Sequence, residues 1–200
     1  MKAKYTQLRA FIQKSGGYAR TAELIKAGFY KAMIYSAMNE GRITRVKNGV
    51  YGLVDIPDIS HPDLVTASVM IPSCVICLIT ALSFYEVTDE VPRYIDVAVP
   101  IGLKVKPVEG LPIRVYHFSL ETWKEGVEEH DLDGHKIKIY SLAKTIADCF
   151  KFRNQIGVDI ARSALKNALE QKKVNHRDIM KFASTCRVTN VVKPILETLI

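Results

Sequence analysis

Residues 16–53 constrain the fold of this 200-residue chain more than any other stretch. Two short amphipathic helical patterns are separated by Gly28, and Gly41 then precedes two β-rich runs joined by Lys47-Asn48-Gly49. An Asn-Gly pair between apolar residues is typical of a hairpin, because both central residues of a type I′ turn need a positive φ. Helices followed by a basic hairpin are the layout of a winged helix. Residues 1–57 are therefore predicted to form a winged-helix domain.

The hydrophobic pattern predicts the other elements of this domain. A first helix is expected to end at Gly16-Gly17, and residues 18–20 are expected to pair with the hairpin as an edge strand. Thr21 is a candidate N-cap for a second helix over residues 22–27, with Leu24 and Ile25 pointing inward.

The third helix, expected over residues 29–40, is the candidate recognition helix. Its predicted inward face consists of Tyr30, Ile34, Ala37 and Met38. Ala32, Ser36 and Asn39 point the opposite way, with Lys31 and Tyr35 on the flanks. Small and hydrogen-bonding side chains suit a surface that enters the major groove of DNA. Because exposed helical faces are commonly polar, the argument depends on the position of this helix before a basic hairpin.

The hairpin is expected to contact the DNA backbone or the minor groove rather than to select bases. Arg42, Arg45, Lys47 and Asn48 surround its tip, and Arg20 lies on the neighbouring strand. The complete set of predicted DNA-contacting residues is Arg20, Lys31, Ala32, Tyr35, Ser36, Asn39, Arg42, Arg45, Lys47 and Asn48.

The charge of the chain is unevenly distributed around a net value of +7. Residues 1–60 carry ten Lys/Arg against four Asp/Glu, residues 61–135 carry five against twelve, and residues 136–200 carry thirteen against five. A basic domain fits a polyanionic partner, since phosphate neutralisation with counterion release supplies most non-specific affinity for nucleic acid. Basic helices are also often simply solvated. The agreement of fold and charge favours double-stranded DNA as the partner of the N-terminal domain.

A polar joint that contains Pro57, Ser60 and Pro62 is the predicted domain boundary, so residues 62–200 are expected to form a second domain. Helices are expected over residues 62–70 and 75–85, and strands over residues 94–99, 113–118 and 135–140. Residues 121–133 are expected to include a loop that leads to an Asp133-Gly134 turn. Further helices start near Ser141, Ala161 and Asn175, and Pro194 is expected to start or kink the last one. The fold class is α+β, a winged helix followed by a mixed α/β domain that ends in helices.

Four segments, in the same order, resemble the AbiEi-type antitoxins of type IV toxin–antitoxin systems, which belong to abortive-infection (AbiE) antiviral defence. These segments are AELIKAGFYKAMIYSAMNEGRITRVKNGVYGL, ICLITALSFYEVTDEVPRYIDVAVP, LPIRVYHFS and IYSLAKTIADCFKFRNQIGVDIARSAL. The ordered set, rather than any single motif, carries the resemblance. It implies a winged helix that binds inverted repeats in its own promoter and represses the operon. It also implies a second domain that neutralises a nucleotidyltransferase-like toxin, without the stable complex usual in type II pairs.

The basic last third of the chain is the candidate surface for that toxin. A nucleotidyltransferase is expected to need acidic metal ligands and to handle phosphates, so a basic surface suits either its active site or competition for its RNA substrate. Two alternatives stay open: the same surface extends the DNA contact, or it is simply solvated. The candidate residues are Lys136, Lys138, Lys144, Lys151, Arg153, Arg162 and Lys166.

The sequence predicts no enzyme, cofactor or metal site. Cys74 and Cys77 have the spacing of a zinc knuckle, but no second ligand pair follows them. Asp96, on a predicted strand, lacks the acidic residue and lysine two positions apart that a metal-dependent nuclease places on an adjacent strand. The chain has neither a secretory segment nor a clean membrane span, so a cytoplasmic protein with reduced thiols is expected.

Two other hypotheses remain. The chain is a winged-helix regulator whose α/β domain binds a small ligand, or it is a DNA-cleaving enzyme with a winged-helix targeting domain.

Overall fold

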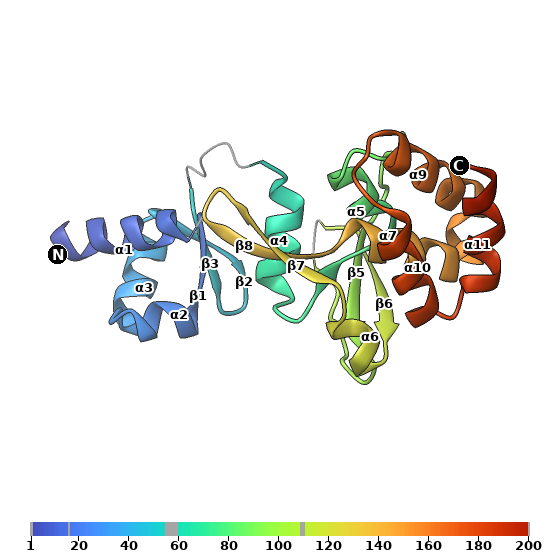
Figure 1. The fold of residues 1–200 in the computed structure, drawn as a ribbon. Coiled ribbons are helices and arrows are strands. Elements are labelled where there is room, and N and C mark those ends of the chain that lie inside the picture. Colours follow the sequence, from blue (N-terminus) through green and yellow to red (C-terminus); the bar gives the residue numbers. More distant parts are fainter. Residues whose placement is uncertain (1, 16, 55–59, 109–110, 200) are drawn as a thin grey trace. The chain divides into compact units, whose positions relative to one another are not determined.

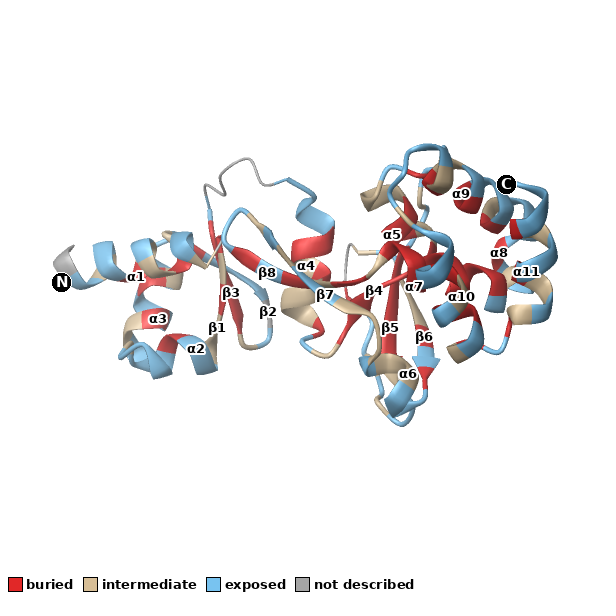
Figure 2. Ribbon diagram, in the orientation of Figure 1, coloured by how far each residue is buried: buried red, intermediate tan, exposed pale blue. Residues whose placement is uncertain are grey.

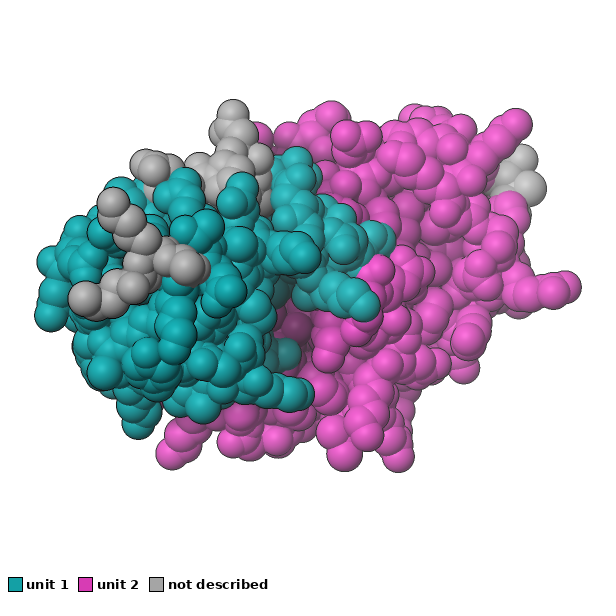
Figure 3. Space-filling model, turned by 90° about the vertical axis from the view of Figure 1, so that its left-hand side faces the viewer, with its two compact units in different colours: residues 1–72, 130–137 teal, residues 73–129, 138–200 magenta. Residues whose placement is uncertain are grey.

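The structure, a computed structural model, describes residues 2–15, 17–54, 60–108 and 111–199 (Figure 1). The described residues divide into two compact units, coloured separately in Figure 3. Unit 1 consists of Met1–Pro72 and His130–Ile137, and unit 2 consists of Ser73–Glu129 and Lys138–Ile200. The α+β fold class is confirmed.

Unit 1 is built around a winged helix. Its elements are α1 (Lys2–Lys14), β1 (Tyr18–Arg20), α2 (Thr21–Lys26), α3 (Lys31–Asn39), β2 (Ile43–Lys47), β3 (Val50–Leu53) and α4 (Pro62–Met70). The strands form an antiparallel sheet in the order β1-β3-β2, so residues 18–20 pair with the hairpin as predicted. Leu8, Leu24, Ile34 and Leu53 are at most 1% exposed and form the core that fixes the three helices on this sheet.

The turn of the hairpin differs from the predicted type I′. Gly49 has a φ of 79°, but Asn48 does not take a positive φ, which type I′ requires at both positions. The strand register shifts between Arg45 and Lys47, so one residue of β2 is left over as a bulge. The bulged turn needs a left-handed residue only at Gly49, which explains why the hairpin forms without the predicted turn type.

Two residues of the predicted inward faces lie outside the core. Ile25 is 46% exposed and Tyr30 is 54% exposed. Tyr30 precedes α3 and takes an extended conformation as its N-cap, so helical spacing does not apply to it. The prediction for Ile34 and Ala37, which are buried, is correct.

A mixed five-stranded sheet runs in the order β6-β5-β4-β8-β7. Its strands are β4 (Val75–Ile76), β5 (Ile95–Pro100), β6 (Ile113–Phe118), β7 (Val127–Leu132) and β8 (His135–Tyr140). β4 pairs antiparallel with β5 and parallel with β8, while β5 and β6 are parallel neighbours. The expectation of a helix from residue 75 is wrong, because residues 75–76 form an interior strand. The expected loop of residues 121–133 is instead a short helix followed by the edge strand β7.

Unit 2 surrounds its part of this sheet with helices. They are α5 (Leu78–Phe84), α6 (Leu120–Lys124), α7 (Leu142–Lys151), α8 (Arg153–Ile156), α9 (Val158–Glu170), α10 (His176–Thr185) and α11 (Thr189–Thr198). Every residue from 142 to 150 of α7 is buried, and this helix packs against α5, α9, α10 and α11 (Figure 2). The Ser141 and Asn175 side chains accept hydrogen bonds from the backbone N–H groups of Lys144 and Asp178, so the predicted caps form. Pro194 lies inside α11 rather than at its start.

The compact unit that holds the winged helix also includes segments outside residues 1–57. α4 and the tip of the β7–β8 hairpin, residues 130–137, are grouped with the winged helix. Asp133 and Gly134 form the predicted turn with φ values of 53° and 89°, and an Asp133 carboxylate oxygen accepts a hydrogen bond from the Ser60 backbone at 2.7 Å. Pro57 lies outside the described residues, so a boundary at residues 57–62 stays a prediction.

Candidate nucleic-acid interface

The outer face of α3 is exposed and has the composition that the sequence predicted. Lys31, Ala32, Tyr35, Ser36 and Asn39 are all exposed. Ile34 and Ala37, on the opposite side of α3, are 1% and 4% exposed and hold the helix against the core. A rigid helix therefore presents one positive charge, one aromatic ring and three small or amide side chains to solvent.

A groove of about 590 Å³ runs along one side of this face, between α1 and α3. Ala32 and Ser36 line it from α3, Glu40 lines it from the position that follows α3, and Lys4 lines it from α1. The Lys4 ammonium lies 5.3 Å from the centre of the Tyr30 ring, which is the contact that Tyr30 makes instead of entering the core. The helical spacing of α3 alone gave no indication that α1 contributes a basic side chain here.

Glu40 joins two of the predicted DNA-contacting residues. Its Oε1 accepts a hydrogen bond from Ser36 Oγ at 2.9 Å, and its Oε2 pairs with Arg42 Nε at 2.8 Å. The Arg42 guanidinium also lies 4.4 Å from the centre of the Tyr5 ring, and the Tyr5 hydroxyl donates to the Arg42 carbonyl at 3.3 Å. Arg42 is therefore held in position by a carboxylate and an aromatic ring.

The other side of α3 faces the hairpin. The Arg45 guanidinium donates to the Asn48 side-chain oxygen, which orients both predicted contacts at the hairpin tip. Burial raises the pKa of the Tyr51 hydroxyl, and the neighbouring Tyr35 side chain raises it further. Thr21 donates through its backbone N–H and its hydroxyl to the Gly49 carbonyl at 2.8 and 3.2 Å. The start of α2 thus fixes the hairpin tip. Lys47 ends β2, but its side chain lies outside what the structure describes.

Arg20 has a structural contact that the sequence did not predict. Its Nε donates to the Val69 carbonyl at 2.9 Å, and its Nη2 reaches the Ser68 carbonyl at 3.4 Å. These carbonyls belong to the last turn of α4, where a cation is favoured by the helix dipole. Its backbone N–H donates to Glu23 at 2.8 Å. The guanidinium therefore binds α4, and a DNA contact by Arg20 stays an untested prediction.

The predicted toxin-contacting basic residues of the last third differ in the unit to which they belong and in their exposure. Lys136 is exposed in unit 1, whereas Lys151, Arg162 and Lys166 are exposed in unit 2. Arg162 and Lys166 follow one face of α9, and Lys166 pairs with Glu170 at 3.8 Å. Lys138 is half-buried, and Arg153, also half-buried, donates to the Phe150 carbonyl at 2.9 Å.

Lys144, expected on that basic surface, is instead fully buried. Its Nζ lies 2.5 Å from Asp148 Oδ2, and neither side chain is exposed. Its ammonium also lies 4.4 Å from the centre of the Tyr140 ring and 5.0 Å from that of Phe118. Lys144 and Asp148 are four residues apart in a stretch, residues 142–150 of α7, whose other members are apolar or small. This spacing is the sequence feature that indicates an internal ion pair.

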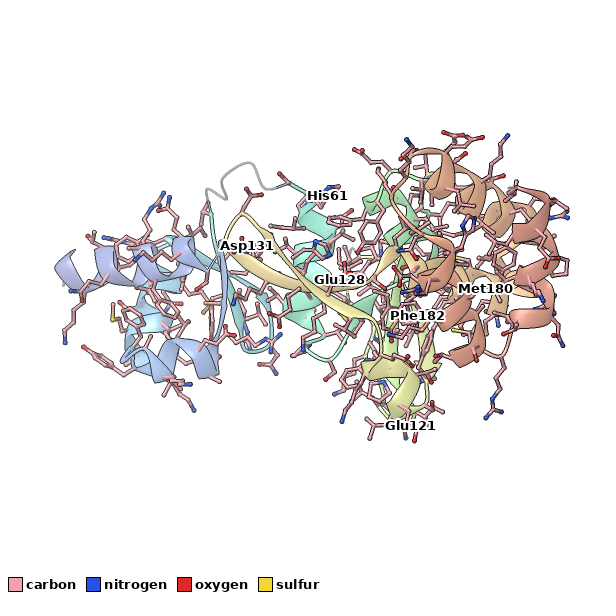
Figure 4. All side chains as sticks on the ribbon, viewed as in Figure 1. His61, Glu121, Glu128, Asp131, Met180 and Phe182 are labelled. Atoms are coloured by element: carbon pink, nitrogen blue, oxygen red, sulfur yellow. The ribbon has the colours of Figure 1, made fainter. Side chains whose placement is uncertain are left out.

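The candidates for other chemistry are accounted for by packing. Asp96 is buried and pairs with Arg114 at 2.7 and 3.1 Å. Burial raises its pKa, while the Arg114 hydrogen bond opposes that shift. The four cysteines, all within the described residues, are buried and form no disulfide, and burial raises the pKa of the Cys77 and Cys149 thiols. The acidic side chains of Glu128 and Asp131 come from β7 (Figure 4).

No group of three or more His, Cys, Asp or Glu suited to a metal ion occurs among the described residues. Within the same part of the chain, no helix is long and apolar enough to cross a membrane.

Similarity to known proteins concerns the fold of the chain and the sequence of its winged helix. No curated protein matches the chain. The crystal structure of the RV2827C protein from Mycobacterium tuberculosis is similar in fold, with a TM-score of 0.58 and 11% sequence identity. The similarity covers 90% of this chain and 70% of that chain. Residues 7–54 match the family model for the AbiEi antitoxin transcriptional regulator, and this match spans α1 to β3. The winged helix of this chain is therefore similar in sequence to the regulator domain of AbiEi antitoxins.

Proposed function

We propose that this protein is the antitoxin and transcriptional autorepressor of a type IV toxin–antitoxin system, acting in the cytoplasm. Its winged helix binds inverted repeats in its own promoter, with α3 in the major groove. Its second domain counteracts a nucleotidyltransferase toxin, without a stable complex being required. The observation that carries the proposal is the exposed face of α3, flanked by Lys31, Arg42 and Arg45, inside the residues that match the AbiEi regulator family.

The predicted DNA-contacting residues on and beside α3 fall into two groups with different tasks in this proposal. Ala32, Ser36 and Asn39 are small or hydrogen-bonding, so they approach base edges closely. Lys31, Arg42, Arg45 and Lys47 neutralise phosphates and position the helix. Electrostatic attraction by the second group supplies affinity for any duplex, and the first group supplies the preference for the promoter.

The proposal is tested first on DNA. The full-length protein should shift a fragment of its own promoter at lower concentrations than a random duplex of equal length, and both affinities should fall steeply with salt. Mutating either half of the inverted repeat should remove the preference. Binding that is insensitive to salt would overturn the assignment of this face to DNA.

The antitoxin activity is tested by co-expression with the adjacent gene. Growth should be arrested by a nucleotidyltransferase encoded next to this chain and restored when the full-length protein is expressed with it. A Lys31→Ala/Arg42→Ala variant should still restore growth while failing to repress the promoter. This result would separate neutralisation from repression without cutting the chain. Loss of both activities in a folded variant would contradict the division of tasks.

A regulator that binds a small ligand is the second candidate. The observation in its favour is a cavity of about 720 Å³ in unit 2, lined by Leu142, Lys172, Lys173 and Phe182 among others. This volume lies within the range of small-molecule sites. A ligand regulator should repress its promoter in a metabolite-dependent way and should not protect cells from the product of the adjacent gene.

A further inference from the structure

We propose that Glu40 is a specificity-determining residue of the DNA interface and selects cytosine in the major groove. The inference rests on the proposed function, because it concerns the base that the same face of α3 contacts. It adds a residue that neither the predicted recognition face nor the predicted phosphate contacts included.

The position of Glu40 is electrostatically unfavourable unless the carboxylate has a specific partner. It follows the last residue of α3, where the helix dipole disfavours a negative charge. It also lines the groove beside Ala32 and Ser36, on a face where duplex phosphates would repel it. Its pairing with Arg42 offsets part of this cost in the free protein.

The Glu40 carboxylate is held in one orientation. Ser36 Oγ binds Oε1 at 2.9 Å and Arg42 Nε binds Oε2 at 2.8 Å, while Arg42 itself stacks on Tyr5. A side chain fixed in this way loses little conformational entropy when it meets a base. The side chain of Glu40 nevertheless keeps 47% of its surface exposed, so it remains accessible.

The chemistry of the carboxylate identifies the base. An ionised carboxylate has two oxygens and about four lone-pair sites, and it only accepts hydrogen bonds. Ser36 and Arg42 use one site on each oxygen, which leaves sites for an external donor. Cytosine presents its N4 amino group as a donor in the major groove, whereas guanine presents acceptors and thymine an acceptor and a methyl group. Adenine places its N7 acceptor beside its amino group and would repel the second oxygen, so cytosine is the matching base.

Arg42 complements this contact. The guanidinium has five N–H donors, of which the Nε–H is directed at Glu40. The remaining fork can bind a phosphate while the carboxylate binds the cytosine. Glu40 therefore acts on bases, and it also positions the arginine that acts beside it.

The test is selection of binding sites from a random duplex library by the full-length protein and by its Glu40→Gln and Glu40→Ala variants. Wild type should enrich cytosine at one position of each half-site. Glutamine binds adenine through N6 and N7, so Glu40→Gln should replace cytosine by adenine at that same position. Glu40→Ala should lose the preference there. On the selected site, changing this cytosine should weaken wild-type binding by about tenfold and should leave the Glu40→Ala variant nearly unchanged.

Two further variants separate base selection from other effects. Ser36→Ala removes the partner of Oε1, so it should weaken the cytosine preference without creating one for adenine. Glu197→Gln removes the same charge from an exposed side chain of unit 2 and should leave base preferences as in wild type. Thermal unfolding of each variant verifies that it is folded.

The contrary outcomes are distinct. Both Glu40 variants could keep the preference for cytosine and bind all sequences more tightly than wild type by the same factor. Glu40 would then only repel phosphates, and the inference would be wrong. If wild type selects no sequence and shows no salt dependence, the proposed DNA-binding function fails with it, and that result is seen before any variant is made.

Discussion

Charged side chains in the winged helix and in unit 2 are used in opposite ways. In the winged helix, Lys31 and Arg45 lie at the surface, and Glu40 and Arg42 pair with each other where solvent still reaches them. In unit 2, the Lys144–Asp148 pair is fully buried and Asp96 is buried beside Arg114. The same residue types are therefore exposed in one region, where we propose that they bind DNA, and packed in the interior of the other.

This difference has an energetic basis. An exposed charge is already hydrated, so its removal costs little stability and its attraction to phosphate remains available for binding. A buried charge has lost its hydration and depends on its partner. Variants of the winged helix should therefore change DNA binding, whereas variants of the buried pairs should change folding.

The largest expected effect is that of Asp148→Ala. The substitution leaves the Lys144 ammonium buried without its carboxylate and should reduce the free energy of unfolding by about 3–5 kcal/mol. Urea unfolding followed by Trp123 fluorescence measures this, since Trp123 is the single tryptophan and packs against the core of unit 2. Lys166→Ala, at an exposed lysine of α9, should change stability by less than about 0.5 kcal/mol. Equal effects of the two variants would remove the distinction between buried and exposed charges.

Asn39→Ala is expected to act on specificity. Losing a base contact should reduce the free-energy difference between promoter and random-duplex binding by about 1–3 kcal/mol. The slope of log K against log salt should stay as in wild type. Competition gel shifts with both duplexes measure the ratio. Parallel losses on the two duplexes would place Asn39 among the phosphate contacts instead.

Lys31→Ala combined with Arg42→Ala should weaken binding to promoter and random DNA alike. Removing two phosphate contacts should flatten the slope of log K against log salt by about 1.8. Between 50 and 200 mM salt the wild type should then lose about tenfold more affinity than the variant. Arg162→Ala combined with Lys166→Ala is the matched control in unit 2. A similar flattening in the control would show that the basic face of α9 extends the DNA contact.

The smallest expected effect is the pH dependence of unit 2. Burial raises the pKa of Asp96 above its ordinary value of 3.8, so the folded state holds this proton more tightly than the unfolded state. Its contribution to stability is therefore fully present below pH 3.8 and is lost as the pH rises through the raised value. Asp96→Asn should lack this loss when urea midpoints are compared from pH 4 to 7. Parallel curves for wild type and variant would show that Asp96 titrates normally.

Local rules predicted the parts of the winged helix that depend on local structure. The edge strand, the hairpin and the buried face of α3 follow from periodicity and from Gly49, which takes the left-handed conformation that the turn requires. The exposure of Tyr30 was not predicted, because this residue is the N-cap of α3 and its ring contacts Lys4 on another helix. The sequence also did not predict the groove or the Glu40–Arg42 pair. Both depend on side chains that come together from α1, from α3 and from the turn between α3 and β2.

Unit 2 was less predictable because its main features are not local. β4 has two residues, so it carries no periodicity, and it exists because β5 and β8 pair with it on either side. β7 is rich in acidic residues because it is an edge strand, a position where charges discourage pairing with other chains. Lys144 was placed at the surface by its residue type alone, although Asp148 one helical turn later indicates the internal pair.

The contact between Arg20 and the end of α4 bears on how such a protein diversifies. The helix that follows the winged helix in the chain is tied to β1 by the guanidinium, and residues 130–137 complete the same unit from a distant part of the sequence. A unit assembled from two separate stretches cannot be exchanged by a single recombination event. If α3 binds the promoter as we propose, new promoter preferences should therefore arise by substitution on α3 rather than by exchange of whole domains between genes.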